Sequence, residues 1–401
     1  MFVVGFAGVV ALVTGLIHLY LWKRLVRDTL PRGRARRIAG FAVLGLALLI
    51  PAAIILPDRY LAGFAWAGYL WLAVMFYLLV LLAVLELPML VAKLVLRRRA
   101  AVPARVPALV GAGGPAPLPE RPPDHNPDRR LLLARGAAIF AGLTAVGLTG
   151  SGVRTALGDP VLKRVVIPLS KLDRRAHGLR IALVADIHLG PILRRGHTER
   201  IVSRINELGA DLVAIVGDLV DGTVEELGSS AEPLRDLRSR YGSFFVTGNH
   251  EYFSGFEPWI DEVARLGVRP LRNERVEIAG GALDLAGVND VTGQRFGDAP
   301  DIPRALADRD PSRPVVLLAH QPVQAFEAAR HGVDLQLSGH THGGQMVPFN
   351  LLVRLQQPMV SGYGEIDGTK VYVTDGAGFW GPPVRVGTRP EITLVELRAG
   401  S

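Results

Sequence analysis

Side chains that bind metal ions occur at five points in the second half of this 401-residue chain, each directly after a short apolar run. Their carboxylate, amide and imidazole groups suit Mn²⁺, Fe and Zn²⁺ alike. The chain has no cysteine, so thiolate metal sites and disulfides are excluded. The five clusters are Asp186-Ile187-His188, Gly217-Asp218-Leu219-Val220-Asp221, Gly248-Asn249-His250-Glu251, His320 and Gly339-His340-Thr341-His342-Gly343-Gly344-Gln345.

The spacing within these clusters predicts a pair of metal ions. Alternate residues of an extended segment point the same way, so Asp186 and His188 can bind one ion. His340 and His342 can in the same manner each face a neighbouring ion. Two ions held about 3.5 to 4 Å apart generate a hydroxide near neutral pH and clamp a phosphoryl group for in-line attack. Phosphoester hydrolysis is the reaction that most needs both effects.

Each cluster alone has an ordinary structural explanation. An Asp-x-His after a strand is usually a capped turn, Asp218 and Asp221 could cap a helix, and His320 could be a buried histidine with satisfied hydrogen bonds. Their common position at strand ends favours a joint metal centre. The remaining histidines are interpreted as structural or solvated: His18, His125, His177, His197 and His331.

The elements that must position these clusters follow an α/β pattern. From Arg180 onward, short β-branched runs alternate with stretches of helical period, which predicts a strand before each cluster. The carboxyl ends of such strands converge on one crevice, so residues 150 positions apart can share a metal ion. The predicted strands are 181–185, 212–216, 244–247, 283–288, 315–319, 335–337 and 371–374.

The first part of the chain has the composition of a membrane protein. Apolar residues make up 49% of the chain and concentrate before residue 155. We expect three membrane helices in residues 1–96, a basic Pro/Gly-rich linker over 97–130, a fourth membrane helix over 131–154 and the hydrolytic domain over 155–401. Residues 2–22 could instead be a cleaved signal peptide, which is the weaker reading. For residues 60–96 we expect one helix to about Leu87 with a kink at Pro88, and a helical hairpin is the weaker alternative.

Charge divides at the same place. Residues 1–154 hold 18 Lys and Arg against 6 Asp and Glu, whereas residues 155–401 hold 27 against 31. The basic loops 23–37 and 93–135 should stay in the cytoplasm, which places the hydrolytic domain on the extracytoplasmic face. Arg129 and Arg130 fit either a twin-arginine export signal or an ordinary basic flank equally well. No nucleic acid is expected as a partner, because the soluble part is slightly acidic.

The ordered motifs resemble the calcineurin-like metallophosphoesterase superfamily, and the GNHE and GHTHGGQ forms are similar to its membrane-associated bacterial phosphodiesterase branch. The resemblance covers about residues 163–398 and implies a four-layer αββα sandwich behind an all-α transmembrane section of about four helices. It implies that one ion takes Asp186, His188 and His342, the other takes Asn249, His320 and His340, and Asp218 bridges them. It also gives His250 a catalytic role, either protonating the leaving oxygen or stabilising charge, whereas Asp221 either orients a ligand histidine or caps a helix.

The expected function is therefore that of a membrane-anchored phosphohydrolase with two divalent ions, Mn, Fe or Zn. Its partners would be the lipid bilayer and a phosphoester of a lipid headgroup or envelope component; the oligomeric state is left open. A non-catalytic membrane sensor and a transporter with a regulatory hydrolase-like domain are the alternatives. Only His18 and Glu86 are ionisable within the apolar stretches, which disfavours transport. The stretch from Phe379 to Pro383 is either a packed turn or an apolar surface for membrane or lipid.

Overall fold

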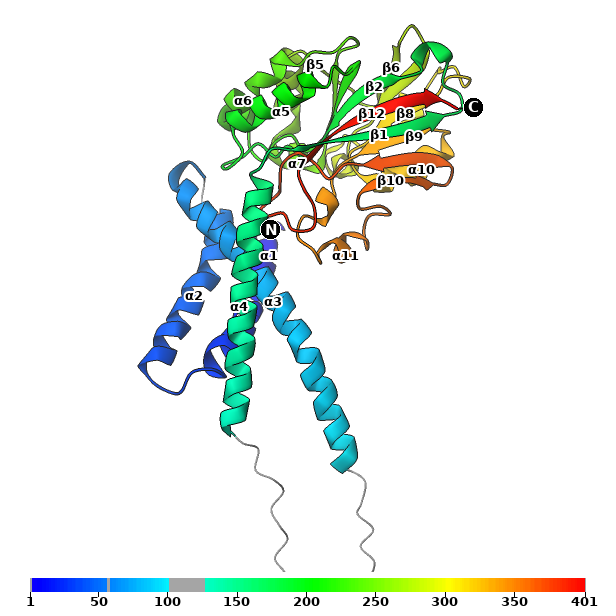
Figure 1. The fold of residues 1–401 in the computed structure, drawn as a ribbon. Coiled ribbons are helices and arrows are strands. Elements are labelled where there is room, and N and C mark those ends of the chain that lie inside the picture. The colour runs from blue at the N-terminus through cyan, green and yellow to red at the C-terminus, as the bar shows by residue number, and fades with distance from the viewer. Residues whose placement is uncertain (1, 56–57, 101–126, 401) are drawn as a thin grey trace, which may run out of the picture. The chain divides into compact units, whose positions relative to one another are not determined.

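A computed structural model describes residues 2–55, 58–100 and 127–400 (Figure 1). The chain divides into two compact units, Met1–Thr149 and Gly150–Ser401. Each unit is built around its own set of elements, helices in the first and two sheets in the second. The predicted linker over 97–130 falls mostly outside the described residues.

The first unit consists of long apolar helices. Helix α1 spans Phe2–Leu21, α2 spans Arg34–Ile55, α3 spans Asp58–Ala100, and α4 begins at Pro127 and ends at Ala156, inside the second unit. Helix α3 passes through Pro88 without ending, further than the predicted end near Leu87. Within the described residues, three segments are long and apolar enough to cross a membrane: Arg34–Ala52, Trp66–Pro88 and Leu131–Ala156.

The two ionisable residues predicted inside the apolar stretches both have polar partners. The carboxylate of Glu86 lies 3.0 Å from Nε of Arg24 and accepts a hydrogen bond from the Tyr20 hydroxyl. His18 is 2.8 Å from the Thr14 carbonyl oxygen and accepts from the indole of Trp71. These contacts satisfy the polar groups locally, as expected of side chains that support helix packing.

The second unit contains two six-stranded mixed sheets. In the first sheet, four neighbouring strands are parallel and two strands complete one edge. In spatial order they are β1 (Val161–Leu169), β12 (Glu391–Ala399), β2 (Leu179–Val184), β3 (Leu212–Val216), β4 (Ser243–Val246) and β5 (Val268–Pro270).

The second sheet has four parallel strands between two antiparallel edge strands. In spatial order they are β10 (Gly362–Ile366), β11 (Thr369–Val373), β9 (Leu335–Ser338), β8 (Val315–Leu318), β7 (Leu283–Gly287) and β6 (Glu274–Ile278).

Apolar side chains arrange these sheets and their helices in four layers. The inner core joins residues of both sheets, for example Leu183 and Ala214 of the first with Leu285 and Leu318 of the second. A second core lies between the first sheet and helices α5 (Arg195–Glu207), α6 (Val224–Ala231) and α8 (Phe256–Arg265). A third covers the outer face of the second sheet with α9 (Ile302–Ala305) and α10 (Ala325–Arg330). This confirms the predicted αββα sandwich.

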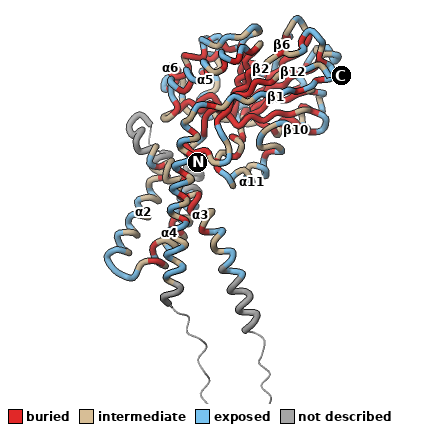
Figure 2. The backbone as a smooth tube through the Cα atoms, in the orientation of Figure 1, coloured by how far each residue is buried: buried red, intermediate tan, exposed pale blue. Residues whose placement is uncertain are grey.

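Burial explains why the central strands consist mostly of apolar residues. Every residue of β3, β4, β8 and β9 is buried, and Figure 2 shows these strands as the buried interior of the unit. A parallel strand covered on both faces has no side exposed to water, so it loses the polar alternation of an exposed sheet. The few polar residues within these strands, Ser243 of β4 and Gln336 and Ser338 of β9, are buried, and the charged residues lie in the loops that follow.

Candidate metal centre

The candidate ligands follow strands of both sheets at nearly constant offset. Asp186 comes two residues after β2, Asp218 two after β3 and Asn249 three after β4. In the second sheet His320 comes two residues after β8 and His340 two after β9. Since the two sheets pack face to face, the carboxyl ends of their strands form one edge at which all these side chains meet.

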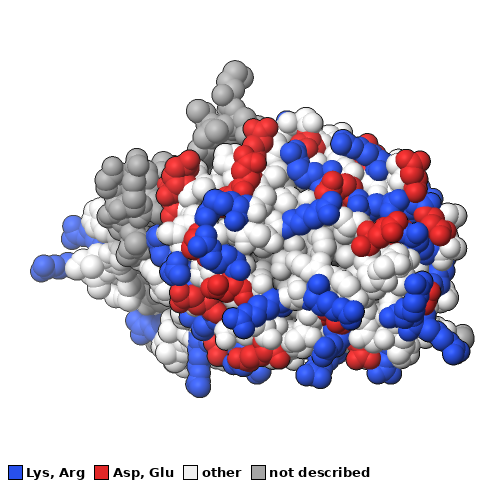
Figure 3. Space-filling model, turned by 90° about the horizontal axis from the view of Figure 1, so that it is seen from above, with Lys and Arg blue, Asp and Glu red and all other residues white. Residues whose placement is uncertain are grey.

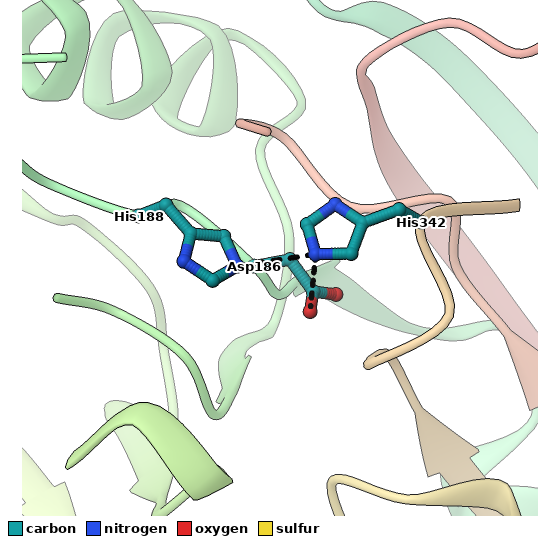
Figure 4. A group of neighbouring side chains, drawn as sticks. All are labelled: Asp186, His188 and His342. Carbon is teal, nitrogen blue, oxygen red and sulfur yellow. Dashed lines mark hydrogen bonds and ion pairs between the residues drawn. The ribbon is translucent and has the colours of Figure 1, made fainter. Parts of the chain in front are cut away.

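The first ligand group consists of Asp186, His188 and His342, whose ligand atoms lie within 4.8 Å of one another. Figure 4 shows the two imidazoles facing each other beside the carboxylate. The Nε2 atoms of the histidines are 3.1 Å apart, and Nε2 of His342 is 3.5 Å from Oδ1 of Asp186. All three side chains are buried.

The second ligand group consists of Asp218, His320 and His340. The Nδ1 atom of His320 is 2.8 Å from the carbonyl oxygen of Val216, which makes Nδ1 the protonated nitrogen and leaves Nε2 available as a ligand. That Nε2 lies 3.1 Å from Oδ2 of Asp218. Asp218 also lies 3.8 Å from Nε2 of His188, so its carboxylate stands between the two groups.

Buried polar atoms at this centre fit metal binding. Among the described residues, Oδ1 of Asn249 is buried without any hydrogen-bond partner. A buried amide oxygen without a partner costs about 1 to 3 kcal/mol, which a bound cation would offset. Burial raises the pKa of Asp186 to about 6 and lowers the pKa of His340 to about 3. The residues therefore suit divalent cations, which favour the ionised carboxylate and the neutral imidazole.

The backbone at these ligands is not extended, which corrects the argument from strand alternation. Positive φ angles occur at Asp186 (53°), His188 (49°), Asp218 (51°), His340 (71°) and His342 (52°). Non-glycine residues rarely adopt this left-handed conformation, and such strain concentrates at functional sites. The side chains converge because each loop turns sharply after its strand, and alternation along an extended segment plays no part.

Asp221 contacts two histidines of the centre. Its Oδ1 lies 2.8 Å from Nδ1 of His188 and 2.7 Å from Nδ1 of His250. The following helix, α6, is capped by Thr223. Of the two roles considered for Asp221, these contacts favour the orientation of histidines.

Glu251 holds two of the motif loops together, a contribution that the sequence did not reveal. Its buried carboxylate accepts hydrogen bonds from the backbone N–H groups of Gly248 (2.6 Å), Asp218 (3.0 Å) and Leu219 (2.7 Å). The only sequence signal was its place at the end of Gly248-Asn249-His250-Glu251. Burial, with the charge of Asp218, raises the pKa of Glu251 to about 7.

Arg385 supports the centre from outside the motifs. Its buried guanidinium donates to the carbonyl oxygens of Asp375 (2.7 Å) and Gly378 (2.6 Å) and lies 3.3 Å from Nδ1 of His342. Burial lowers the pKa of Arg385 to about 10, while Asp375 opposes that change. No motif marks this residue, because it comes 43 positions after His342 in sequence.

Comparison with known proteins assigns the chain to a family. The model of the calcineurin-like phosphoesterases matches residues 179–344, which contain all the predicted ligands. A Helicobacter pylori protein named as an uncharacterised metallophosphoesterase is 41% identical over 277 residues, covering 68% of this chain and 74% of the relative. The chain belongs to the calcineurin-like phosphoesterases. It is accordingly a hydrolase of phosphoric esters.

Two further relatives extend this family likeness. A Campylobacter jejuni metallophosphoesterase is 32% identical over 399 residues, covering 98% of both chains, so the likeness includes the N-terminal helices. A zebrafish (Danio rerio) protein named as a transmembrane protein with a metallophosphoesterase domain is 41% identical over 268 residues, 64% of this chain and 61% of its own. This phosphoesterase therefore has relatives in both bacteria and vertebrates.

Proposed function

We propose that this phosphoesterase is a membrane-anchored phosphodiesterase that binds two divalent metal ions. The observation that carries the proposal is the position of Asp218, whose Oδ2 lies 3.1 Å from Nε2 of His320 and 3.8 Å from Nε2 of His188. One carboxylate oxygen thus lies within 4 Å of a histidine of each ligand group, an arrangement suited to a pair of ions rather than to a single one.

The ligand sets follow from the two groups. Asp186, His188 and His342 would hold one ion; Asn249, His320 and His340 would hold the other; and Asp218 would bridge them. Bound divalent ions would lower the pKa of a water molecule and neutralise phosphoryl oxygens. Mixed imidazole and oxygen ligation suits Mn²⁺, Fe and Zn²⁺, so the identity of the metal has to be measured.

His250 is the side chain best placed to donate a proton to the leaving oxygen. Burial lowers its pKa, but the carboxylates of Asp218 and Asp221 more than offset that effect and raise the pKa of His250 to about 9. These carboxylates favour the imidazolium, the form that can donate a proton. Since Nδ1 is engaged by Asp221 at 2.7 Å, Nε2 is the nitrogen left to donate.

Membrane anchoring is supported by the three apolar segments and by the relatives with transmembrane names. The basic loops 23–37 and 93–135 favour a multi-pass arrangement with the catalytic unit on the extracytoplasmic face. A bacterial cell membrane is the proposed location, with a phosphoester of a lipid headgroup or envelope component as substrate. Arg129 and Arg130 remain candidates for an export signal.

Other functions have less support. A metal-binding sensor without turnover would not need His250 beside a complete ligand set. A transporter is less favoured, because His18 and Glu86, the ionisable residues of the apolar stretches, contact Trp71 and Arg24 in helix packing. Nucleic acid is a poor partner for this surface, because basic and acidic side chains are interspersed over the face seen in Figure 3. The hydrolase remains the best-supported function.

The test uses the full-length protein in detergent with Mn²⁺, Fe²⁺ or Zn²⁺. We expect hydrolysis of bis-p-nitrophenyl phosphate that exceeds hydrolysis of p-nitrophenyl phosphate. The matched Asp218→Asn variant, which keeps the shape of the side chain but not its charge, should lose activity by at least about 100-fold. A folded, metal-loaded wild-type protein that cleaves neither compound would contradict the proposal.

A further inference from the structure

Large apolar side chains are exposed on one edge of the catalytic unit, next to the metal centre. Leu355 is 80% exposed, Leu351 61% and Trp380 56%, and Val347 and Leu352 are exposed as well. We call these five residues the apolar rim. Clusters of this kind on a soluble surface usually mark a binding site, because exposed apolar area is unfavourable in water.

Hydrogen bonds hold the two parts of the apolar rim together. The Gln345 side chain donates to the carbonyl oxygens of Trp380 (2.9 Å) and Pro382 (3.1 Å) and accepts from the backbone N–H of Trp380 (3.0 Å). The N–H of Val347 donates to the carbonyl oxygen of Val386 at 3.0 Å. The segment that carries α11 (Asn350–Val353) and the loop that carries Trp380 therefore form one fixed surface.

The same loop is joined to the end of α4. The N–H of Arg385 donates to the carbonyl oxygen of Gly152 at 3.0 Å. A side chain at position 152 would collide with Val384 and Val386, so the helix and the loop are in direct backbone contact. Phe379 is buried in this region against Ala156 and Leu193, so the stretch from Phe379 to Trp380 is partly a packed turn and partly an exposed apolar surface.

The position of Gly152 along the helix sets the depth of this loop. The apolar segment of α4 begins at Leu131, and Gly152 follows it by 21 residues. About 20 helical residues cross the ~30 Å hydrocarbon layer of a bilayer. Gly152 lies within the apolar segment Leu131–Ala156, four residues before its end. If α4 crosses a bilayer from Leu131, Gly152 comes about where the helix leaves the hydrocarbon, and the loop bonded to it comes near that boundary.

The metal centre adjoins the apolar rim. The ring of Trp380 lies 5.9 Å from the ring of His250, and the ring of the 65%-exposed Phe253 also lies 5.9 Å from it. His342, a candidate ligand, precedes Val347 by only five residues. The catalytic groups are thus about one side chain away from the apolar surface.

We propose that the apolar rim inserts into the headgroup region of the bilayer that anchors the protein, and that the substrate is a phosphodiester of a membrane lipid headgroup. Trp and Leu side chains favour that region, and the backbone bond to Gly152 holds the rim at its depth. This inference rests on the proposed phosphodiesterase function. It adds that the headgroup region of the bilayer covers the apolar rim, and that the substrate belongs to the membrane lipids.

The absence of cysteine allows a direct test of docking. A Leu355→Cys variant of the full-length protein, labelled with an environment-sensitive fluorophore, is reconstituted into vesicles of phosphatidylcholine and phosphatidylglycerol. Replacing the phosphatidylcholine by its brominated form should quench the label by about half, as expected for a side chain at the acyl boundary. The matched control is Ser312→Cys, an exposed position in the loop before β8, whose label should keep its intensity. Equal quenching of both labels would overturn the proposal. So would a label at position 355 whose fluorescence reports an apolar environment but is not quenched, because a contact between protein copies would then cover the apolar rim.

A second variant tests the substrate class. Replacing Leu351, Leu352 and Leu355 together by Asn should leave hydrolysis of bis-p-nitrophenyl phosphate unchanged, because none of these side chains belongs to the ligand groups. Release of the headgroup from phosphatidylglycerol vesicles should fall at least tenfold. An equal fall with both substrates, or no fall with vesicles, would refute the role of the apolar rim. Failure of the wild-type protein on every substrate would count against the proposed function, while the quenching result would still decide the docking.

Discussion

Oδ1 of Asp221 lies 2.7 Å from Nδ1 of His250. The same oxygen lies 2.8 Å from Nδ1 of His188, so one carboxylate oxygen orients a candidate ligand and the candidate proton donor together. The pKa of Asp221 is lowered to about 2 by these two histidines in spite of its burial, and its negative charge is therefore present throughout the neutral range. Changes at Asp221 should alter catalysis through both histidines.

We expect Asp221→Asn to lower kcat for bis-p-nitrophenyl phosphate by about 10- to 100-fold, the usual effect of removing a carboxylate that orients a metal-binding histidine. The amide has no negative charge to favour the imidazolium of His250. The matched control is Asp261→Asn on the exposed face of α8, which should retain activity. A variant as active as the wild type would show that His188 and His250 are oriented by other contacts.

Glu251→Gln should destabilise the catalytic unit. The carboxylate accepts three backbone N–H groups, and an amide would turn its own N–H donors toward some of them. A buried donor left without an acceptor costs about 1 to 3 kcal/mol. The free energy of unfolding should fall by that amount in a urea titration, whereas the exposed control Glu257→Gln should unfold like the wild type. Identical unfolding of both variants would argue against this role.

Gly339→Ala should weaken metal binding through steric contact alone. The added Cβ would collide with Ala185 and with the carboxylate of Asp186, and Gly339 is absent from the residues with positive φ, so no backbone strain is added. The metal content after dialysis, measured by mass spectrometry, should drop. Gly150→Ala is the matched control, because its Cβ would meet nothing within 4 Å. Full metal content in the Gly339 variant would contradict the placement of Asp186 as a ligand.

Removal of the ions should affect both activity and stability. Dialysis against a chelator should abolish diester hydrolysis, and Mn²⁺ should restore it. Ligands present at about 100 times their Kd stabilise the folded state by roughly 2.7 kcal/mol, so the Tm should fall on chelation and recover with Mn²⁺. A Tm that does not respond to metal would indicate that the clustered side chains are satisfied without ions.

His197 should make the stability of the catalytic unit depend on pH. Burial, assisted by Arg200 and Arg385, lowers its pKa to about 4, whereas an unfolded chain has a histidine pKa of 6.5. The unfolded state therefore takes up the proton first, and stability present above pH 6.5 is lost as the pH falls toward 4. At pH 5.5 the loss is about 1.4 kcal/mol.

The measurement compares the free energy of unfolding at pH 7.5 and pH 5.5 in wild type and His197→Gln. The variant cannot titrate at this position, so its loss between the two values should be about 1.3 kcal/mol smaller. Ligand histidines titrate in both proteins and cancel in the comparison. Equal losses in the two proteins would mean that His197 is protonated in the folded state.

Much of this molecule could be predicted from local patterns. The apolar runs at residues 212–216 and 315–319 indicated buried strands, because a parallel strand covered on both faces keeps few polar residues. The clusters after these runs indicated the candidate ligands, because the carboxyl ends of parallel strands meet at one edge. The apolar stretch over 131–154 indicated the helix that became the end of α4.

The tertiary structure decided what no local pattern contains. Glu251 lies within a motif, but two of its three backbone partners, Asp218 and Leu219, lie in another loop that only the packing of the strands brings close. Arg385 reaches His342 across 43 residues, and Gly152 meets Arg385 across more than 200. The left-handed backbone conformation of the ligands could not be predicted from the sequence either. Contacts around each loop hold it, against the conformational preference of the residues themselves. Sequence thus determined which chemistry the chain carries, because ligand types and strand periods are local properties. Only the fold determined which groups orient that chemistry, because those contacts join residues far apart in the chain.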